Sequence, residues 1–256
     1  AAIQRQFHHL VRTVPRRGRL IVNGQDERLA EVLAMGCWTP VERFGFDSSL
    51  EWSARLVNED GSVFVVLHNG VDIGQVHWPM LGNHNVLNGL AALAAVHAVG
   101  VDIASVIPSL AGFHSVKRRL EVIGSANGIT VYDDFAHHPT AIQTTLQGLR
   151  AKVGAARIVV AMEPRSNSMR LGAHADALAP SLDIADVVVF LARPELPWDA
   201  GKVVSAVRGD ARTVAEGNAL IAALRGIARS GDHVVFMSNG GFDGAPRRFH
   251  AALRDG

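Results

Sequence analysis

The feature that most constrains the fold of this chain is a series of continuously apolar segments in its C-terminal half. The segments "ITVYDD", "RIVVAME", "DVVVFLA" and "HVVFMS" alternate with stretches of helical pattern. A strand that is apolar on both faces must be covered on both faces, as in a parallel sheet between two layers of helices. The sequence therefore predicts an α/β domain with a mostly parallel sheet, which we place at residues 113–256.

The N-terminal part of the chain has a different pattern. "RLIVN" predicts a short strand, and "DERLAEVLAMG" predicts a helix with an acidic first turn. Between residues 51 and 79, Asp-Gly and Asn-Gly turn signals separate apolar segments, which predicts antiparallel hairpins. A long Ala/Leu-rich helix over 83–100 and a second helical segment that Pro108 interrupts come next. We interpret residues 1–112 as part of a separate α/β domain with an antiparallel flap.

Composition excludes several classes of protein. The chain has 25 basic and 24 acidic residues, which argues against a nucleic-acid partner bound through bulk charge. No apolar run reaches membrane-spanning length and no stretch has a signal-peptide pattern, so we expect no membrane partner. Cys37 is the single cysteine, so a disulfide framework is impossible and we expect a reducing compartment, the cytoplasm. No partner base lies near it in "GCWTP", so we expect no nucleophilic role.

The stretch "VYDDFAHHP" places two aspartates and two histidines where a buried strand meets a helix. Ligands of open parallel sheets bind outside the carboxyl ends of the strands. Neighbouring strand residues point to opposite faces, so Asp133 and Asp134 should differ in role. One could accept hydrogen bonds from a ribose diol, and the other could pair with a cation or with backbone. The alternative is that both only cap the helix. A metal site at His137 and His138 is less expected, because adjacent histidines rarely bind one ion.

Two weaker signals lie outside this stretch. Asn85 and Asn88 are three residues apart, so they share one face at the start of a helix, where amides could bind an adenine edge or an anion. Helix capping would explain one of them equally well. Arg118 and Arg119 follow the domain boundary, and an arginine there could reach a phosphate held by the other domain. The alternative is a solvated charge cluster.

Taken in order, "NHNVLN", "FHSVKRRLEV" and "YDDFAHHP" resemble the ATP-dependent Mur ligases of bacterial cell-wall synthesis. The resemblance covers nearly the whole chain. It implies a Rossmann-like C-terminal domain preceded by part of the central ATP-binding domain. It further implies that Asp134 binds the ribose of ATP and that His84, Asn85 and Asn88 lie near the adenine. Arg119 would be the catalytic cation that reaches the phosphates.

Two further segments, "EPRSNSMRLGAH" and "FMSNGGFDG", narrow the resemblance. They are most similar to family members that join UDP-N-acetylmuramate to the tripeptide L-alanyl-γ-D-glutamyl-meso-diaminopimelate, using ATP and Mg²⁺, in peptide recycling. The siblings that add L-alanine are the alternative. The guanidinium group of an arginine can form two parallel hydrogen bonds with a carboxylate, and the tripeptide carries several carboxylates. The substrate-binding residues implied are Arg165, Asn167, Arg170, Ser238, Asn239 and, at the entrance of the crevice, His137.

The chain departs from the family at the phosphate-binding loop. Gly-Lys occurs only at Gly201-Lys202, and valine follows, so no Gly-x-x-Gly-Lys-Thr/Ser segment is present. The magnesium-holding glutamate and histidine and the modified lysine of the family have no match either. We therefore expect a C-terminal fragment that is inactive alone, with most magnesium ligands outside it. Other readings are a non-catalytic nucleotide- or peptide-binding module and, because "SNGGFDG" is glycine-rich, a nicotinamide-dependent oxidoreductase.

Overall fold

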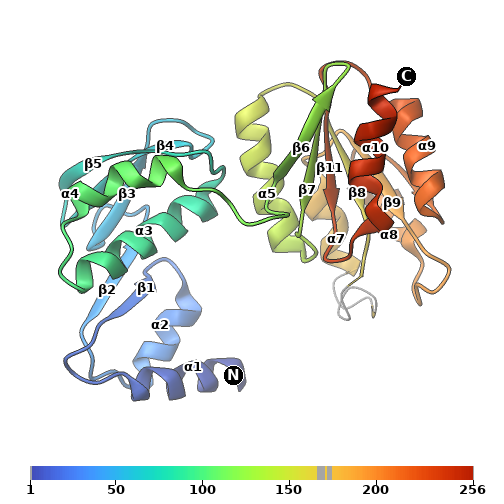
Figure 1. The fold of residues 1–256 in the computed structure, drawn as a ribbon. Coiled ribbons are helices and arrows are strands. Elements are labelled where there is room, and N and C mark those ends of the chain that lie inside the picture. Colours follow the sequence, from blue (N-terminus) through green and yellow to red (C-terminus); the bar gives the residue numbers. More distant parts are fainter. Residues whose placement is uncertain (1, 166–170, 172–174, 256) are drawn as a thin grey trace. The chain divides into compact units, whose positions relative to one another are not determined.

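The computed structural model describes residues 2–165, 171 and 175–255. The chain divides into two compact units, residues 1–114 and 115–256. Figure 1 colours the first unit from blue to green and the second from green to red.

The first unit is built on a five-stranded sheet in the order β1-β2-β3-β4-β5. Strands β1, β2 and β3 pair in parallel, whereas β4 pairs antiparallel with both β3 and β5, which confirms the predicted hairpins. Pro108 lies in the first turn of a 3-10 helix, which confirms the interruption of the second helical segment. The elements are α1 (Ala2–Thr13), β1 (Leu20–Asn23), α2 (Glu27–Ala34), β2 (Val41–Gly45), β3 (Trp52–Leu56), β4 (Val63–His68), β5 (Val71–His77), α3 (Asn83–Ala98), α4 (Ile103–Val106) and η1 (Ile107–Gly112).

The core of the first unit lies between its sheet and α3. Val86, Leu90 and Leu93 recur at three- or four-residue spacing on one face of α3 and are buried. They belong to the same apolar cluster as Trp52 and Phe64 of the sheet, which are fully buried. Burial of such side chains contributes roughly 1.5–3 kcal/mol each, so this face holds α3 against the strands.

The second unit contains a six-stranded sheet in the order β10-β9-β8-β11-β7-β6. All pairings are parallel except that of β6 with β7, so the predicted α/β class is confirmed. Asn127 and Gly128 both have positive φ in the turn between these two strands, as a tight hairpin turn requires. The elements are β6 (Glu121–Ala126), β7 (Ile129–Asp134), α5 (Pro139–Val153), β8 (Ile158–Met162), α7 (Ala175–Leu182), β9 (Val187–Leu191), α8 (Ala200–Ala206), β10 (Asp210–Val214), α9 (Gly217–Ile227), β11 (His233–Met237), η2 (Phe242–Gly244) and α10 (Ala245–Arg254).

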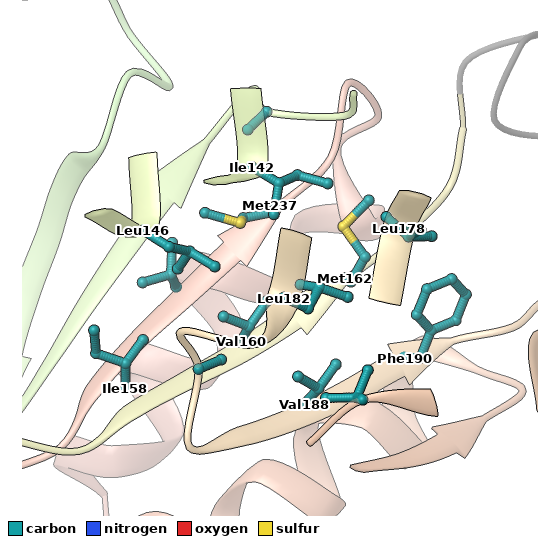
Figure 2. Close-up of a cluster of buried hydrophobic side chains, with 14 of the residues drawn as sticks. Ile142, Leu146, Ile158, Val160, Met162, Leu178, Leu182, Val188, Phe190 and Met237 are labelled. Atoms are coloured by element: carbon teal, nitrogen blue, oxygen red, sulfur yellow. The ribbon is translucent and has the colours of Figure 1, made fainter. Parts of the chain in front are cut away.

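Apolar clusters cover both faces of this sheet, which explains the continuously apolar strands. Figure 2 shows one of them, in which Ile142 and Leu146 of α5 and Leu182 of α7 pack against alternate residues of β8 and β9. The opposite face packs against α9 and α10, for example through Leu220 and Phe249. Every residue of β8 and β9 is buried.

The stretch between β9 and α9 is more regular than its sequence suggests. It contains α8 and the edge strand β10. Every residue of β10 is at least partly exposed, and the whole strand pairs on one side only, with β9. The strand is therefore partly polar and lacks the apolar pattern by which the others were predicted.

None of the helices in the described ranges combines the length and apolar character needed to cross a membrane.

Candidate functional site

The candidate site is the edge of the second sheet where β7, β8 and β11 end. Asp134 of β7 and Met162 of β8 both pair with Met237 of β11. The ladder continues one residue further, since Ser238 N donates to Asp134 O at 3.1 Å and Glu163 N donates to Met237 O at 3.1 Å. We call this place the carboxyl edge. Its side chains Asp134, Glu163 and Ser238 are 3%, 1% and 0% exposed, an unusual concentration of buried polar groups.

Both aspartates of "VYDDFAHHP" already have partners within the chain. Asp134 Oδ1 accepts from Ala136 N at 2.7 Å, and its Oδ2 accepts from Leu120 N at 2.6 Å. Burial raises the pKa of Asp134, and these two amides lower it only in part. Asp133 pairs with Arg118 Nε at 3.3 Å, while burial raises the pKa of this carboxyl too. The predicted pairing with a cation or with backbone thus holds for both, and the ribose contact of Asp134 stays a prediction.

The two adjacent arginines lie in different surroundings. Arg118 has a φ of 61° and donates from Nη2 to the carbonyls of Ser238 and Gly240, which fixes the loop after β11. Both guanidinium groups lie over the Phe135 ring, at 5.3 Å for Arg118 and 5.9 Å for Arg119, but Arg119 is exposed. Its charge acts on Asp134, whose pKa it lowers against the larger effect of burial. Arg119 is therefore the arginine of this pair that faces solvent beside the carboxyl edge.

Glu163 organises the other half of the carboxyl edge. Its Oε1 accepts from Arg193 Nε at 2.7 Å, and its Oε2 accepts from Ser238 Oγ at 3.2 Å. Ser238 Oγ in turn accepts from Gly240 N at 2.9 Å. Arg193 also donates from Nη2 to Asp243 Oδ2 at 2.7 Å, and this bond, ahead of that to Glu163, raises the pKa of the guanidinium. The Ser238 hydroxyl is thus engaged and buried, so its direct contact with substrate stays a prediction.

A cavity of about 260 Å³ opens beside this network. Arg165 is exposed on its wall, and Gly240 packs so closely that a Cβ there would lie 2.7 Å from Arg165 Cγ. Asn239 Oδ1 is buried and, among the described residues, has no hydrogen-bond donor. The cavity-lining residues are Pro164, Arg165, Leu191, Arg193, Glu195 and Leu196.

Arg193 is a residue that the sequence reasoning missed. It follows β9, so the rule that ligands bind outside the carboxyl ends of parallel strands applied to it as well. Asn167 and Arg170, predicted to bind substrate with Arg165, lie outside the described residues.

The two histidines support the loop before α5. His137 Nδ1 lies 2.9 Å from Phe135 O, and its ring packs edge-on against the Phe135 ring at 5.2 Å. His138 is the N-cap residue of α5, where Thr140 N donates to its Nδ1 at 3.3 Å. His138 thus has the capping role, and the substrate contact of His137 stays a prediction.

The predicted adenine residues gather at the start of α3. Asn85 Nδ2 donates to Leu81 O at 2.7 Å, so this asparagine has the local role that capping offered as an alternative. His84 is half-buried and Asn88 is exposed one turn later. Contact of these three residues with a nucleotide stays a prediction. Cys37 is a free cysteine whose thiol donates to Thr39 O at 3.3 Å.

Two family models match the chain in the order of its two units. The model for the Mur ligase middle domain matches residues 1–96, and that for the Mur ligase glutamate ligase domain matches residues 118–240. The chain belongs to the Mur ligase family. This confirms the resemblance seen in the sequence.

Several Mur ligases are similar over most of the chain. The UDP-N-acetylmuramate–L-alanyl-γ-D-glutamyl-meso-2,6-diaminoheptandioate ligase of Escherichia coli K12 is 46% identical over 256 residues, which is 100% of this chain and 55% of the relative. A solved murein peptide ligase from Psychrobacter arcticus is 40% identical with a TM-score of 0.72, over 98% of this chain and 54% of that one. The UDP-N-acetylmuramate–L-alanine ligase of Desulfitobacterium hafniense is 31% identical over 72% of this chain and 40% of the relative. The chain thus spans about half the length of the curated relatives that match it end to end.

Proposed function

We propose that this chain forms part of an ATP-dependent ligase that joins UDP-N-acetylmuramate to the tripeptide L-alanyl-γ-D-glutamyl-meso-diaminopimelate, in the cytoplasm. The observation that carries the proposal is that similarity to the tripeptide ligase of E. coli extends over all 256 residues, including the segments that follow β8 and β11. The L-alanine ligase of D. hafniense is similar over 72% of the chain.

The chemistry of the cavity fits an acceptor that is rich in carboxylates. Arg165 and Arg193 line it, and guanidinium groups bind carboxylates through paired hydrogen bonds. Glu163 and Asp243 hold Arg193 in place. Asn239 is not among the residues that line the cavity, so its contact with substrate stays a prediction.

The nucleotide contacts proposed for the C-terminal unit rest on Arg119 and Asp134. Arg119 is exposed and can stabilise phosphate charge. Each carboxylate oxygen has two lone pairs, so Asp134 keeps acceptor capacity for a ribose hydroxyl beside its two amide donors. Its low exposure means that the segment around Leu120 would have to move for the contact to form.

Among the described residues, the one group of three close potential metal ligands does not suit magnesium. This group consists of Glu42, His68 and His97, and two of its three ligand atoms are imidazole nitrogens. Mg²⁺ prefers six oxygen ligands in octahedral geometry. We therefore assign the described residues no step that runs through magnesium.

In the proposed reaction, ATP phosphorylates the lactyl carboxylate of UDP-N-acetylmuramate, and the tripeptide amine then attacks the acyl phosphate and displaces phosphate. The residues of this chain act by positioning the acceptor and by stabilising charge.

The test is Arg165→Ala in the intact ligase, assayed with the tripeptide and with L-alanine as competing acceptors. Loss of one charge-assisted contact of about 1.5–3 kcal/mol should lower use of the tripeptide at least about tenfold, with ATP affinity nearly unchanged. If L-alanine is the better acceptor of the unmodified protein, the chain belongs to the alanine-adding members. If ATP is bound but never turned over with either acceptor, the proposed ligase activity is wrong.

A pair of glycines supplies a matched control. Gly240→Ala places a Cβ against Arg165 and Glu163, whereas Gly241→Ala meets nothing within 4 Å. The first change should impair use of the tripeptide and the second should not. Equal effects of both would show that the loop does not bind the acceptor.

A further inference from the structure

Three potential metal ligands from distant parts of the sequence meet in the first unit. They are Glu42 of β2, His68 at the end of β4 and His97 in the last turn of α3. One donor atom from each lies within 4.8 Å of the other two. None of these residues belongs to the carboxyl edge or to the predicted nucleotide site, so the ligase function does not account for the cluster.

The strand register explains why the side chains converge. Trp52 of β3 pairs directly with His68, and its other neighbour is Phe44 of β2. Glu42 precedes Phe44 by two residues and therefore points to the same face. Helix α3 packs on β1, β2 and β3, which brings His97 over that face.

The surroundings hold the ligands in place. The fully buried Trp52 stacks on His68 with centroids 4.2 Å apart, and its Nε1 donates to Glu42 Oε2 at 2.8 Å. The ring of His97 packs edge-on against His68 at 4.8 Å. Hydrogen bonds such as that from Trp52 to the Glu42 carboxylate orient metal ligands in protein sites.

A cavity of about 350 Å³ adjoins the cluster, and His68 and His97 lie on its wall together with Asp102. The cavity gives an ion a path from solvent and leaves room for water as a further ligand. Two imidazoles and one carboxylate with an open position suit a divalent transition ion such as Zn²⁺.

We propose that Glu42, His68 and His97 bind one divalent transition-metal ion of the zinc type, which joins α3 to strands β2 and β4. Ligand atoms about 2.0–2.2 Å from a zinc ion lie roughly 3.5 Å apart in a tetrahedron, so the side chains close by about 1 Å on binding. Arg19 Nε lies 3.3 Å from Glu42 Oε1 and competes with the ion for this carboxylate.

The experiment is a calorimetric titration of the 256-residue chain with Zn²⁺, with Co²⁺ absorption spectra as a second readout. Both use a Cys37→Ser background, so that the free thiol contributes nothing. We expect one ion per chain, a rise in Tm on adding Zn²⁺, and a Co²⁺ spectrum of an ordered low-coordinate site. His97→Ala should weaken binding at least about tenfold and remove the rise in Tm, since loss of outer-shell partners alone costs about 10- to 100-fold.

The matched control is His77→Ala, which removes an exposed histidine of β5. It should leave stoichiometry, affinity and the rise in Tm unchanged. Arg19→Gln should strengthen Zn²⁺ binding, because it removes the ion pair that occupies the Glu42 carboxylate. If the three residues had only a structural role, this substitution would not strengthen Zn²⁺ binding. Far-UV circular dichroism of each variant separates loss of ligand from loss of fold. The proposed site would be overturned if Zn²⁺ still bound to His97→Ala, or if Zn²⁺ affinity fell equally in His77→Ala. It would also be overturned if the unmodified chain did not bind Zn²⁺ in a stoichiometric amount.

Discussion

At the scale of single residues, the pair Arg118 and Arg119 shows how neighbouring side chains of one type take different roles. Arg118 is tied to Asp133 and to the carbonyls of Ser238 and Gly240. Arg119 is exposed beside the Phe135 ring. The first therefore stabilises the carboxyl edge, and the second keeps its guanidinium exposed to solvent.

This difference predicts opposite results for two alanine substitutions in the intact ligase. Arg118→Ala should lower the free energy of unfolding by about 1.5–3 kcal/mol, the range for a hydrogen bond to a charged group. Arg119→Ala should change it by less than about 0.5 kcal/mol but lower turnover by roughly 10- to 150-fold. Urea unfolding and steady-state kinetics of both variants provide the measurement. Normal turnover in Arg119→Ala would show that this cation does not act on the phosphates.

At the scale of secondary-structure elements, an ion pair joins the segments that lead into β8 and β11. Arg157 Nη2 lies 2.6 Å from Asp232 Oδ2, and Arg157 Nε donates to Asp232 Oδ1 at 2.9 Å. Arg229 N also donates to this carboxylate at 2.9 Å. Burial alone would raise the pKa of Asp232, but these hydrogen bonds outweigh it and hold the pKa below its ordinary value.

The sign of this shift predicts how the stability of the second unit depends on pH. With a pKa lower in the folded than in the unfolded state, Asp232 contributes its full stabilisation above the unfolded value of about 3.9. The contribution disappears as pH falls through the folded pKa. Asp133 and Asp134, whose pKa values are raised, act in the opposite sense, so their contribution falls as pH rises.

Comparison with Asp232→Asn isolates the effect. The variant should lose roughly 1.5–3 kcal/mol at pH 7, and the difference from the unmodified protein should shrink as pH falls below about 4. Asp210→Asn, which removes the exposed partner of Arg212, should cost less than about 1 kcal/mol. Denaturant unfolding from pH 3 to pH 7 tests both. A difference that is independent of pH would contradict the assigned pKa shift.

At the scale of the whole molecule, each of the two compact units has its own core. The sequence contains no Gly-x-x-Gly-Lys-Thr/Ser segment, so neither unit contributes the loop that holds ATP phosphates in this family. The chain by itself should therefore release no phosphate from ATP above background, with or without tripeptide and UDP-N-acetylmuramate. A steady release that Asp134→Ala abolishes would contradict this expectation.

Patterns that depend on near neighbours in the sequence could be predicted. Continuously apolar strands determined the parallel sheet, because such strands are stable only when both faces are covered. Asn127-Gly128 determined the β6–β7 hairpin, because positive φ is accessible to these residues. The end of β7 at Asp134 placed "VYDDFAHHP" at the carboxyl edge. The order of the family motifs determined the family, as the matching domain models confirm.

Roles that depend on contacts between distant residues were decided by the tertiary structure. The sequence could not distinguish Arg118 from Arg119, because the loop after β11 that binds only Arg118 lies 120 residues away. It could not predict the partners of Arg193, because Glu163 and Asp243 reach this residue only through the order of the strands. The meeting of Glu42, His68 and His97 depends likewise on strand register and helix packing. Local patterns determine which face each side chain occupies, whereas its neighbours depend on how the elements pack.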